Sequence, residues 1–168
     1  MLKKLSSKND EYVIVHIDED NWSACYTKKK EDGFIEALIQ KGVSEKNIHI
    51  LKIKDISSVE KETVRMLEIY PNIKGVFVST SKVFCIARVI EAHDLNLALI
   101  GYDLNQENIE YLKSSLIDFI IYQNPQLEAS TAITLLLDHL AFQKKIPRVK
   151  NFPIEIIIKE NHQEYLTL

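Results

Sequence analysis

The sequence has little of what a nucleotide-binding enzyme needs. It contains only four glycines, and none of them belongs to a glycine-rich loop after a strand, so a phosphate cradle is missing. The first apolar segment is followed by Asp18, Glu19 and Asp20, whose negative charge would repel a pyrophosphate. Both features argue against a dinucleotide-binding enzyme and favour a solvated loop at these acids.

Cysteine is also scarce. Cys25 and Cys85 are too few for a disulfide-stabilised scaffold, and neither has further ligands at the spacing of a zinc site. The five histidines are scattered, and the hydrolase motif Gly-x-Ser-x-Gly does not occur. We therefore expect no metal, no cofactor and no catalytic residue. Reduced cysteines are typical of a cytoplasmic protein, which is the location we predict.

An excess of charge and a long apolar run are missing as well. The formal net charge is −3, so no broad basic surface is implied and we expect no direct contact with nucleic acid. No apolar run approaches the roughly 20 residues of a membrane helix. Lys3 and Lys4 are not followed by the apolar segment of a signal peptide, so we expect no membrane association. The 168 residues suffice for one domain or one lobe, spanning 1–168.

The clearest pattern in the sequence runs from Gly75 to Asp103. Its first apolar segment ends in the hydroxyl residues 79–81, a helical pattern follows, and a second apolar segment ends in Gly101-Tyr102-Asp103. Neither segment alternates apolar with polar residues, which indicates strands buried on both faces of a parallel sheet. Ligands of such sheets bind at the carboxyl ends of the strands, where these polar residues lie.

The rest of the chain repeats this order of strand and helix. We predict strands at 12–17, 48–53, 75–78, 97–100, 117–122 and 154–158, and helices at 26–41, 59–70, 83–90, 105–113 and 125–142. Ser57 and Glu60 have the spacing of a capping box, and the residues after 158 read as a polar tail. The predicted fold is a three-layer α/β/α structure with a mainly parallel sheet of about six strands, in which the alternating segment 48–53 lies near an edge.

The helix predicted at 125–142 is unusually apolar. It opens with Asn124-Pro125, a capping residue followed by proline at the first helical position. Apolar side chains lie on more than one side of it, so we expect one side to bury against the sheet and another against a further partner.

A receiver domain of response regulators is one alternative fold. The acids 18–20 would suit its magnesium site, but the position of its phospho-acceptor aspartate reads Ser79-Thr80-Ser81. The lysine that this family has before a proline is replaced by Asn124. Both departures remove the receiver chemistry, so we reject this alternative.

Several short motifs match a second family in order and spacing. Lys30, Gly33 and Phe34 lie at the positions of its Arg-x-x-Gly-Phe/Trp pattern, and Gly101-Tyr102-Asp103 is intact. In this family a further strand ends in glutamine followed by an acid or amide, and the matching segment here is 122–125, Tyr-Gln-Asn-Pro. Over nearly its whole length the chain resembles the C-terminal lobe of the sensor module shared by lactose-repressor-type (LacI/GalR) transcriptional regulators and type 1 periplasmic binding proteins.

This resemblance implies a site for a sugar or a similar polar metabolite. The residues implied to face the ligand are Tyr26, Lys30, Thr80, Lys82 and Asp103. A carboxylate accepts hydrogen bonds from sugar hydroxyls, ammonium groups donate them, and Tyr26 or Trp22 could stack on a sugar face. An equally good reading of the segment 101–103 is a turn in which Asp103 or Asn105 caps the next helix.

The resemblance also implies a role for the whole chain. It would be the effector-sensing part of a cytoplasmic transcriptional regulator, forming a homodimer and reaching DNA through a helix-turn-helix outside this sequence. In such modules the ligand lies between two lobes, so the segment 118–145 would complete the other lobe or make a dimer contact. We predict no catalysis. Two alternatives stay open: a periplasmic sugar-binding or sensor domain of a transporter or histidine kinase, and a small α/β enzyme.

Overall fold

Six strands and five α-helices alternate along the chain in this computed structural model, which describes residues 9–18 and 24–165. The strands are β1 (Glu11–Ile17), β2 (Ile48–Ile53), β3 (Ile73–Val78), β4 (Ala98–Tyr102), β5 (Phe119–Tyr122) and β6 (Glu155–Ile157). The helices are α1 (Ala24–Gln40), α2 (Val59–Ile69), α3 (Val83–Ala92), α4 (Gln106–Lys113) and α5 (Pro125–Phe142).

The strands form one sheet in the order β2-β1-β3-β4-β5-β6. Neighbours from β2 to β5 pair in parallel, and β6 pairs antiparallel to β5. The predicted three-layer fold with a mainly parallel sheet of about six strands is confirmed, and β2 lies at an edge as its alternating sequence indicated. Because β1 and β3 to β5 run the same way, their carboxyl ends share one edge of the sheet, here called the carboxyl edge.

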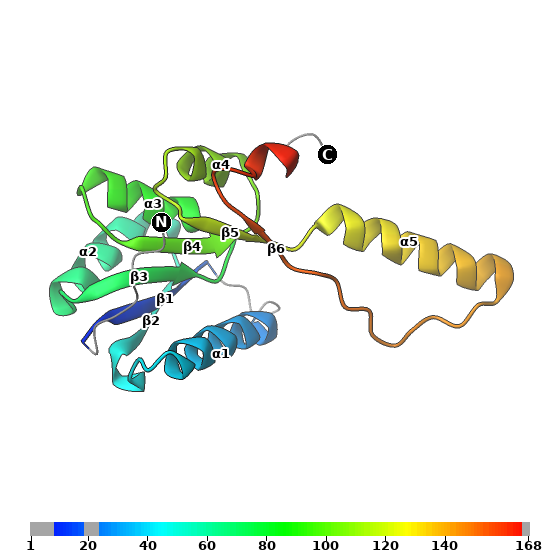
Figure 1. Cartoon of the computed structure of the whole chain (residues 1–168), viewed down its shortest axis with the longest axis horizontal. Coiled ribbons are helices and arrows are strands. Elements are labelled where there is room, and N and C mark those ends of the chain that lie inside the picture. The colour runs from blue at the N-terminus through cyan, green and yellow to red at the C-terminus, as the bar shows by residue number, and fades with distance from the viewer. Residues whose placement is uncertain (1–8, 19–23, 166–168) are drawn as a thin grey trace.

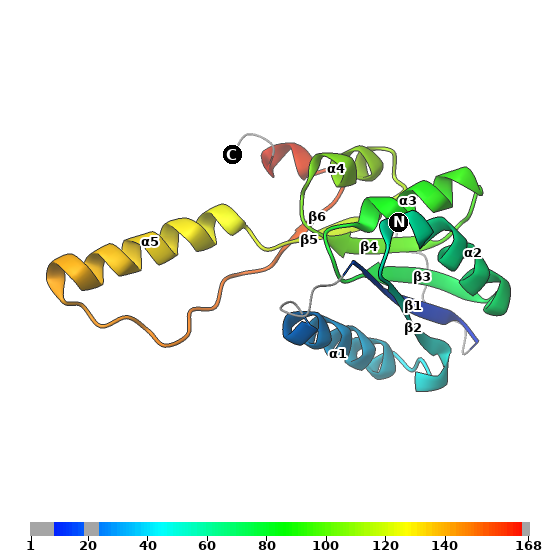
Figure 2. The ribbon, with the colours of Figure 1, turned by 180° about the vertical axis from the view of Figure 1, so that it is seen from behind.

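The two faces of the sheet are covered unequally (Figures 1 and 2). Helices α2, α3 and α4 pack on one face, where Val13, Val15 and Val76 belong to the larger apolar cluster. Helix α1 covers the other face, where Phe34 stacks on Phe77 with ring centroids 4.5 Å apart. A parallel sheet needs cover on both faces, and on the second face α1 provides it for only part of the width.

Gly101 allows β4 and α3 to approach each other closely. A Cβ atom at this position would lie 2.3 Å from Val83 Cβ, where α3 begins. Real side chains do not approach that closely, so glycine is required here for packing rather than for its backbone freedom. The first residue of the Gly-Tyr-Asp motif thus has a structural role.

Two local predictions from the sequence are wrong. Ser58, not Ser57, precedes α2 and makes no side-chain cap; Asp55 instead accepts a hydrogen bond from the Ser57 amide at 2.9 Å. The residues after 158 are not simply a polar tail, because a 3-10 turn at His162–Tyr165 packs the Tyr165 ring edge-on to Tyr122. Apolar contacts of a single tyrosine carry no periodic signal, which explains the second error.

Helix α5 extends away from the sheet (Figure 1), and none of its residues is buried. The chain returns from it along an irregular segment, 143–154, to reach β6. The prediction that one side of α5 packs on the sheet is therefore wrong for this chain alone. Among the described residues, no helix has both the length and the apolar character to cross a bilayer.

We expect Gly101→Ala to lower the free energy of unfolding by about 1–3 kcal/mol, because the new methyl group forces α3 away from β4. Urea denaturation would measure this change. Gly33→Ala is the matched control: nothing lies within 4 Å of a Cβ at Gly33 in α1. That control should raise stability by about 0.5–1 kcal/mol through helix propensity. Equal effects of both substitutions would contradict the packing argument.

Candidate functional site

The ends of β3 and β4 are tied together at the carboxyl edge by one buried side chain, that of Asn108 in α4. Its amide nitrogen donates to the carbonyl oxygens of Ser81, Tyr102 and Asp103, at 3.0, 3.1 and 2.8 Å. Its oxygen accepts from the Phe84 amide at 3.0 Å. Asn108 is fully buried, so these bonds form in a low-dielectric setting where they are strong. They hold the two strand ends in a fixed relation.

The end of β3 carries Thr80 and Lys82. The Thr80 hydroxyl is buried, and no described group forms a hydrogen bond with it. A buried hydroxyl without a partner costs about 1–3 kcal/mol, so a ligand that bonds to it would recover that cost. Lys82 forms an ion pair with Asp18 at the end of β1, and its ammonium group is thereby already engaged.

Lys30 reaches the same edge from the second turn of α1. Its Nζ atom lies 3.7 Å from the centroid of the Tyr102 ring and donates a hydrogen bond to the Ser79 carbonyl at 3.2 Å. A cation over an aromatic face in a partly desolvated place is stabilised by the ring quadrupole. Burial lowers the pKa of Lys30, and the negative charge of Asp103 partly opposes this.

Asp103 follows β4 in a left-handed backbone conformation, with φ at 68°. Its amide donates to the Ile121 carbonyl at 3.2 Å, which joins this turn to β5. Burial raises the pKa of the Asp103 carboxyl, and Lys30 partly lowers it. The N-terminal cap of α4 is Asn105, whose side-chain oxygen accepts a hydrogen bond from the backbone amide of Asn108 at 2.8 Å. Asp103 is therefore not needed as a cap, and its carboxylate has no hydrogen-bond partner among the described residues.

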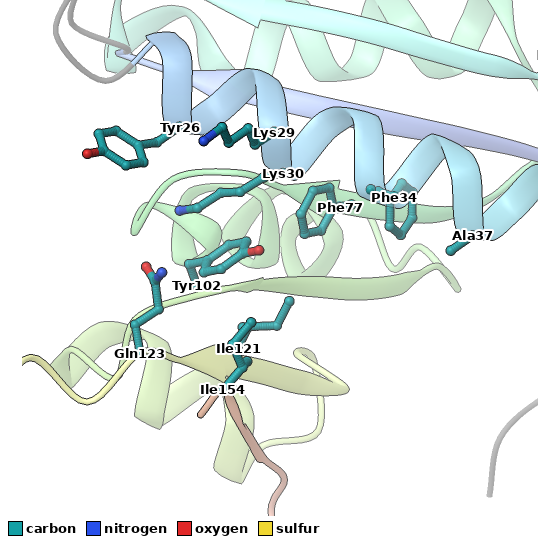
Figure 3. A pocket seen from close by; sticks show the side chains of 11 residues that line it. Tyr26, Lys29, Lys30, Phe34, Ala37, Phe77, Tyr102, Ile121, Gln123 and Ile154 are labelled. Atoms are coloured by element: carbon teal, nitrogen blue, oxygen red, sulfur yellow. The ribbon is translucent and has the colours of Figure 1, made fainter. Parts of the chain in front are cut away.

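A groove of about 550 Å³ begins at this edge and continues along the sheet between α1 and β5 (Figure 3). Its mouth is polar, with Tyr26, Lys29, Lys30 and Gln123. Its inner part is apolar and is lined by Phe34, Ala37, Phe77, Ile121 and Ile154. The groove therefore combines polar groups at the site with an apolar floor beside α1, here called the α1 groove.

Beneath the site lies a buried polar network. His16 Nδ1 lies 2.7 Å from the Ser79 hydroxyl, and His16 Nε2 lies 2.8 Å from a Glu31 carboxylate oxygen. All three residues are buried, and Lys28 adds an ion pair to Glu31 from the surface. Burial alone would raise the pKa of Glu31, but hydrogen bonds from Lys28 and His16 outweigh it and hold that pKa below its usual range. The network anchors Ser79, whose carbonyl accepts from Lys30.

The structure thus brings three of the five predicted ligand residues together, namely Lys30, Thr80 and Asp103. Lys82 lies at the same edge but is paired with Asp18, and the Tyr26 ring is 71% exposed at the groove mouth. Trp22, the other candidate for stacking, lies outside the described residues, as do Glu19 and Asp20. Among the described residues, no group of His, Cys, Asp or Glu is arranged to hold a metal ion.

Sequence reasoning missed the residues that build this site from below. Tyr102 was seen only as part of a motif, although it forms the surface under Lys30. His16 looked like one of several scattered histidines, and its partners Ser79 and Glu31 are 63 and 15 residues away in sequence. Asn108 gave no signal, because an asparagine inside a short helix usually faces solvent.

Comparison with known proteins adds a family match and a set of structural matches. A family model described as "Periplasmic binding protein domain" matches residues 1–144. No curated protein sequence matches the chain significantly.

Solved structures share this fold. One is a proposed LacI transcriptional regulator from Bacteroides fragilis, with a TM-score of 0.75 and 25% identity over 94% of this chain and 56% of that chain. A glucose-galactose binding protein from Geobacillus stearothermophilus has a TM-score of 0.73 and 21% identity, over 92% of this chain and 55% of that one. A periplasmic ribose ABC transporter from Conexibacter woesei has a TM-score of 0.79 and 14% identity, over 95% and 54%.

This chain spans little more than half the length of those matched structures. The comparisons confirm the predicted resemblance to type 1 periplasmic binding proteins at the level of the fold. The narrower assignment to lactose-repressor-type regulators stays a prediction, as do the ligand residues.

The buried network yields a prediction for stability. Because the pKa of Glu31 is lowered in the folded protein, its ionisation stabilises the fold above the ordinary glutamate pKa of about 4.3. That contribution is lost as the pH falls through the lower folded-state pKa. We expect Glu31→Gln to reduce the free energy of unfolding by about 1–3 kcal/mol at pH 7, and this difference should shrink below about pH 4.

Asp32→Asn is the control for Glu31→Gln. Asp32 also pairs with Lys28, at 3.0 Å, but both side chains of this pair are largely exposed. An exposed pair contributes less than about 1 kcal/mol, so denaturant unfolding of this variant should match the parent closely. If Glu31→Gln behaved like Asp32→Asn at every pH, the buried network would have no role in stability.

Proposed function

This chain belongs to the periplasmic binding protein domain family, and from that premise we propose that it is one lobe of a two-lobed protein that binds a sugar. The ligand would lie at the carboxyl edge, against Lys30, Thr80 and Asp103. The observation that carries this proposal is a pair of opposite charges left available at a half-buried place. Lys30 and Asp103 influence each other electrostatically but form no ion pair in the described part of the chain.

The chemistry of these three side chains suits a polyhydroxylated ligand. The Asp103 carboxylate accepts hydrogen bonds, Lys30 donates them, and the unpartnered Thr80 hydroxyl can do either. Alternating donors and acceptors around a sugar ring need such a mixed set. The exposed ring of Tyr26 adds apolar surface on which a C–H face of the sugar could stack. Several matched structures are described as binding sugars, including D-arabinose and D-allose, which supports the same ligand class here.

Two roles for a sugar-binding lobe remain in competition. A cytoplasmic, homodimeric transcriptional regulator of the lactose-repressor type is supported by the Gly101-Tyr102-Asp103 motif and by the likeness to the Bacteroides fragilis protein. A transporter or sensor domain outside the cytoplasm is supported by the several matches to transport proteins. The gene region upstream of Met1 distinguishes them: a helix-turn-helix would support regulation, whereas a signal peptide would support transport.

We propose no catalysis for this site, even though Ser79, His16 and Glu31 form a serine–histidine–carboxylate chain. In a hydrolase the serine oxygen must reach a substrate carbonyl. Ser79 is only 1% exposed, and it points into the structure toward His16. The arrangement therefore suits a structural network, and the small α/β enzyme stays the weakest of the three alternatives.

The second lobe is proposed to contact α5. The helix leaves the sheet directly after β5, so it begins at the carboxyl edge where a ligand would be enclosed. Its apolar residues Ile133, Leu137 and Leu140 are each at least 60% exposed, which is unusual for a stable protein surface. Coverage of this helix by another lobe would place that lobe across the site, with segment 118–145 as the connection.

A sugar-dependent melting experiment tests the function. We expect at least one monosaccharide in a panel of pentoses and hexoses to raise the melting temperature, because it binds only the folded state. Asp103→Asn removes the anionic acceptor and should weaken binding by about tenfold or more, as loss of a charged hydrogen bond does. The pKa of Asp103 is raised, so its carboxylate takes up a proton at a higher pH than an ordinary aspartate does. As the pH is lowered, the affinity of the parent protein for the sugar should therefore begin to fall at that higher pH.

Asp94→Asn is the matched control for this experiment. Asp94 also has a left-handed backbone, with φ at 48°, but it follows α3 at the opposite edge of the sheet. Its substitution should leave the sugar-dependent shift unchanged. The proposal fails if no sugar shifts the melting temperature. If both variants keep the full shift, Asp103 does not contribute to sugar binding.

A further inference from the structure

Strand β2 has one side on which its backbone pairs with no described strand. It lies at an edge of the sheet, with β1 as its neighbour (Figure 1). The Asp18 amide donates to the Ile53 carbonyl at 2.8 Å, so the backbone groups of Ile53 point toward β1. Successive residues of a strand alternate in this direction, so those of Ile50 and Lys52 point away from the sheet. Such a row of outward donors and acceptors is a template for one further strand.

A groove of about 450 Å³ follows this side of β2 on the face covered by α2. Its apolar wall includes Leu51 of β2 with Met66 and Ile69 of α2, and Ile69 is 57% exposed. The ring of His49, stacked on Tyr70 with ring centroids 3.7 Å apart, lines the same groove. We call it the β2 groove. A strand added beside β2 would direct every second side chain toward it.

The opposite face of β2 is incompletely covered as well. Ile50 pairs with Ile14 of β1, which belongs to the apolar cluster beneath α1. Ile14 is fully buried, whereas Ile50 is 47% exposed. An apolar side chain on an added strand would lie beside Ile50 and cover it, because paired residues point to the same face.

The charge along this edge is positive. Lys52 and Lys54 follow Ile50 and are both exposed. Asp55, the next acid along the chain, already accepts a hydrogen bond in the turn that follows. The wall of the β2 groove carries one charge of each sign, at Glu62 and Arg65. The two lysines therefore set the sign of the charge that a further strand would meet, and acidic side chains complement it.

This charge disfavours two occupants that the chain itself could supply. Two copies related by a two-fold axis engage all their outward residues when the two Ile50 residues face each other. In that register Lys54 of each copy lies opposite Lys46 of the other, and directly opposed like charges are destabilising. Residues 1–8 contain three lysines and no acid, so they lack the complementary charge too. Lysine at a sheet edge deters like-charged strands, but it attracts acidic ones.

We propose that the free edge of β2 binds an extended segment of another protein in which apolar residues alternate with acidic ones. The segment pairs with the outward backbone groups of Ile50 and Lys52 and extends the sheet by one strand. Its apolar side chains enter the β2 groove, and its acidic side chains lie beside Lys52 and Lys54. Main-chain hydrogen bonds supply affinity in this mode of binding, and the alternate side chains supply selectivity. The surface uses none of the proposed sugar-binding residues, so it is a further function.

A synthetic peptide, Glu-Val-Glu-Val-Ile-Val-Glu-Val-Glu, tests the proposal on the full chain. Its sequence reads the same in both directions, so parallel and antiparallel pairing are both sampled. With a fluorescent label on the peptide, we expect saturable binding by anisotropy. Hydrogen exchange at the amides of Ile50 and Lys52 should slow when it binds. A peptide with lysine at the four glutamate positions should bind at least about tenfold more weakly, because like charges meet.

Two variants and a control locate the binding. Lys52→Glu should weaken binding of the acidic peptide by about tenfold or more and strengthen binding of the lysine peptide. Ile50→Pro removes an outward amide without breaking a bond to β1, which an edge strand tolerates. It should weaken binding about tenfold through the lost hydrogen bond. Lys145→Glu is the control, because it makes the same change of charge at an exposed residue after α5.

The proposal is overturned if the acidic peptide does not bind, or if both peptides bind equally well. Binding of the acidic peptide that is unchanged in Lys52→Glu would overturn it too, and this variant decides the matter even if Ile50→Pro does not fold. A dimer of the parent chain that the acidic peptide dissociates would indicate a second copy at the edge, which also overturns it. None of these results alters the sugar-dependent melting shift, so the two functions fail separately.

Discussion

Parallel pairing of the strands is the constraint on which both the site and the exposed helix depend. Parallel strands all end at one edge, and their connections must return across the faces of the sheet. The first consequence gathers Lys30, Thr80 and Asp103 at the carboxyl edge, although Lys30 and Asp103 are 73 positions apart in sequence. The second consequence requires helices on both faces, and the chain places three on one face and one on the other. The polar site and the apolar gap therefore have the same origin.

The electrostatics of the edge follow from incomplete burial. Lys30 is desolvated enough for its pKa to fall, and Asp103 enough for its pKa to rise, so each charge is less favourable than it would be in water. Direct contact between them would remove much of that cost. Instead Lys30 is held over Tyr102 and bonded to the Ser79 carbonyl, which keeps its ammonium group beside the Asp103 carboxylate without closing the pair. Groups held in this way can exchange a poor environment for hydrogen bonds with a ligand.

The sequence predicted the elements of this fold better than it predicted the support of its site. Apolar segments without alternation revealed β3 and β4, because strands buried on both faces need few polar residues. The Gly-Tyr-Asp motif marked the end of β4, and each of its residues has a different role. Gly101 leaves room for the Val83 side chain, and the Tyr102 ring lies under Lys30. Asp103 adopts the left-handed backbone conformation after the strand. Asn108 and His16 escaped detection, since their partners are distant in sequence and no periodicity marks a buried hydrogen-bond network.

Helix α5 shows what an apolar sequence pattern leaves undetermined. Its composition predicted cover on two sides, because apolar residues exposed on several sides are unfavourable in water, whereas none of its residues is buried in this structure. Composition carries no information on whether the cover comes from the same chain, and the local geometry at Asn124 and Pro125 decides against the chain's own sheet. In the proposed two-lobed protein, a contact from outside would cover a helix that begins beside the ligand residues, and ligand binding would then have a mechanical consequence. A sugar held at the carboxyl edge would favour the arrangement in which the two bodies on either side of it are closed, because a closed arrangement adds contacts to the ligand from the second body.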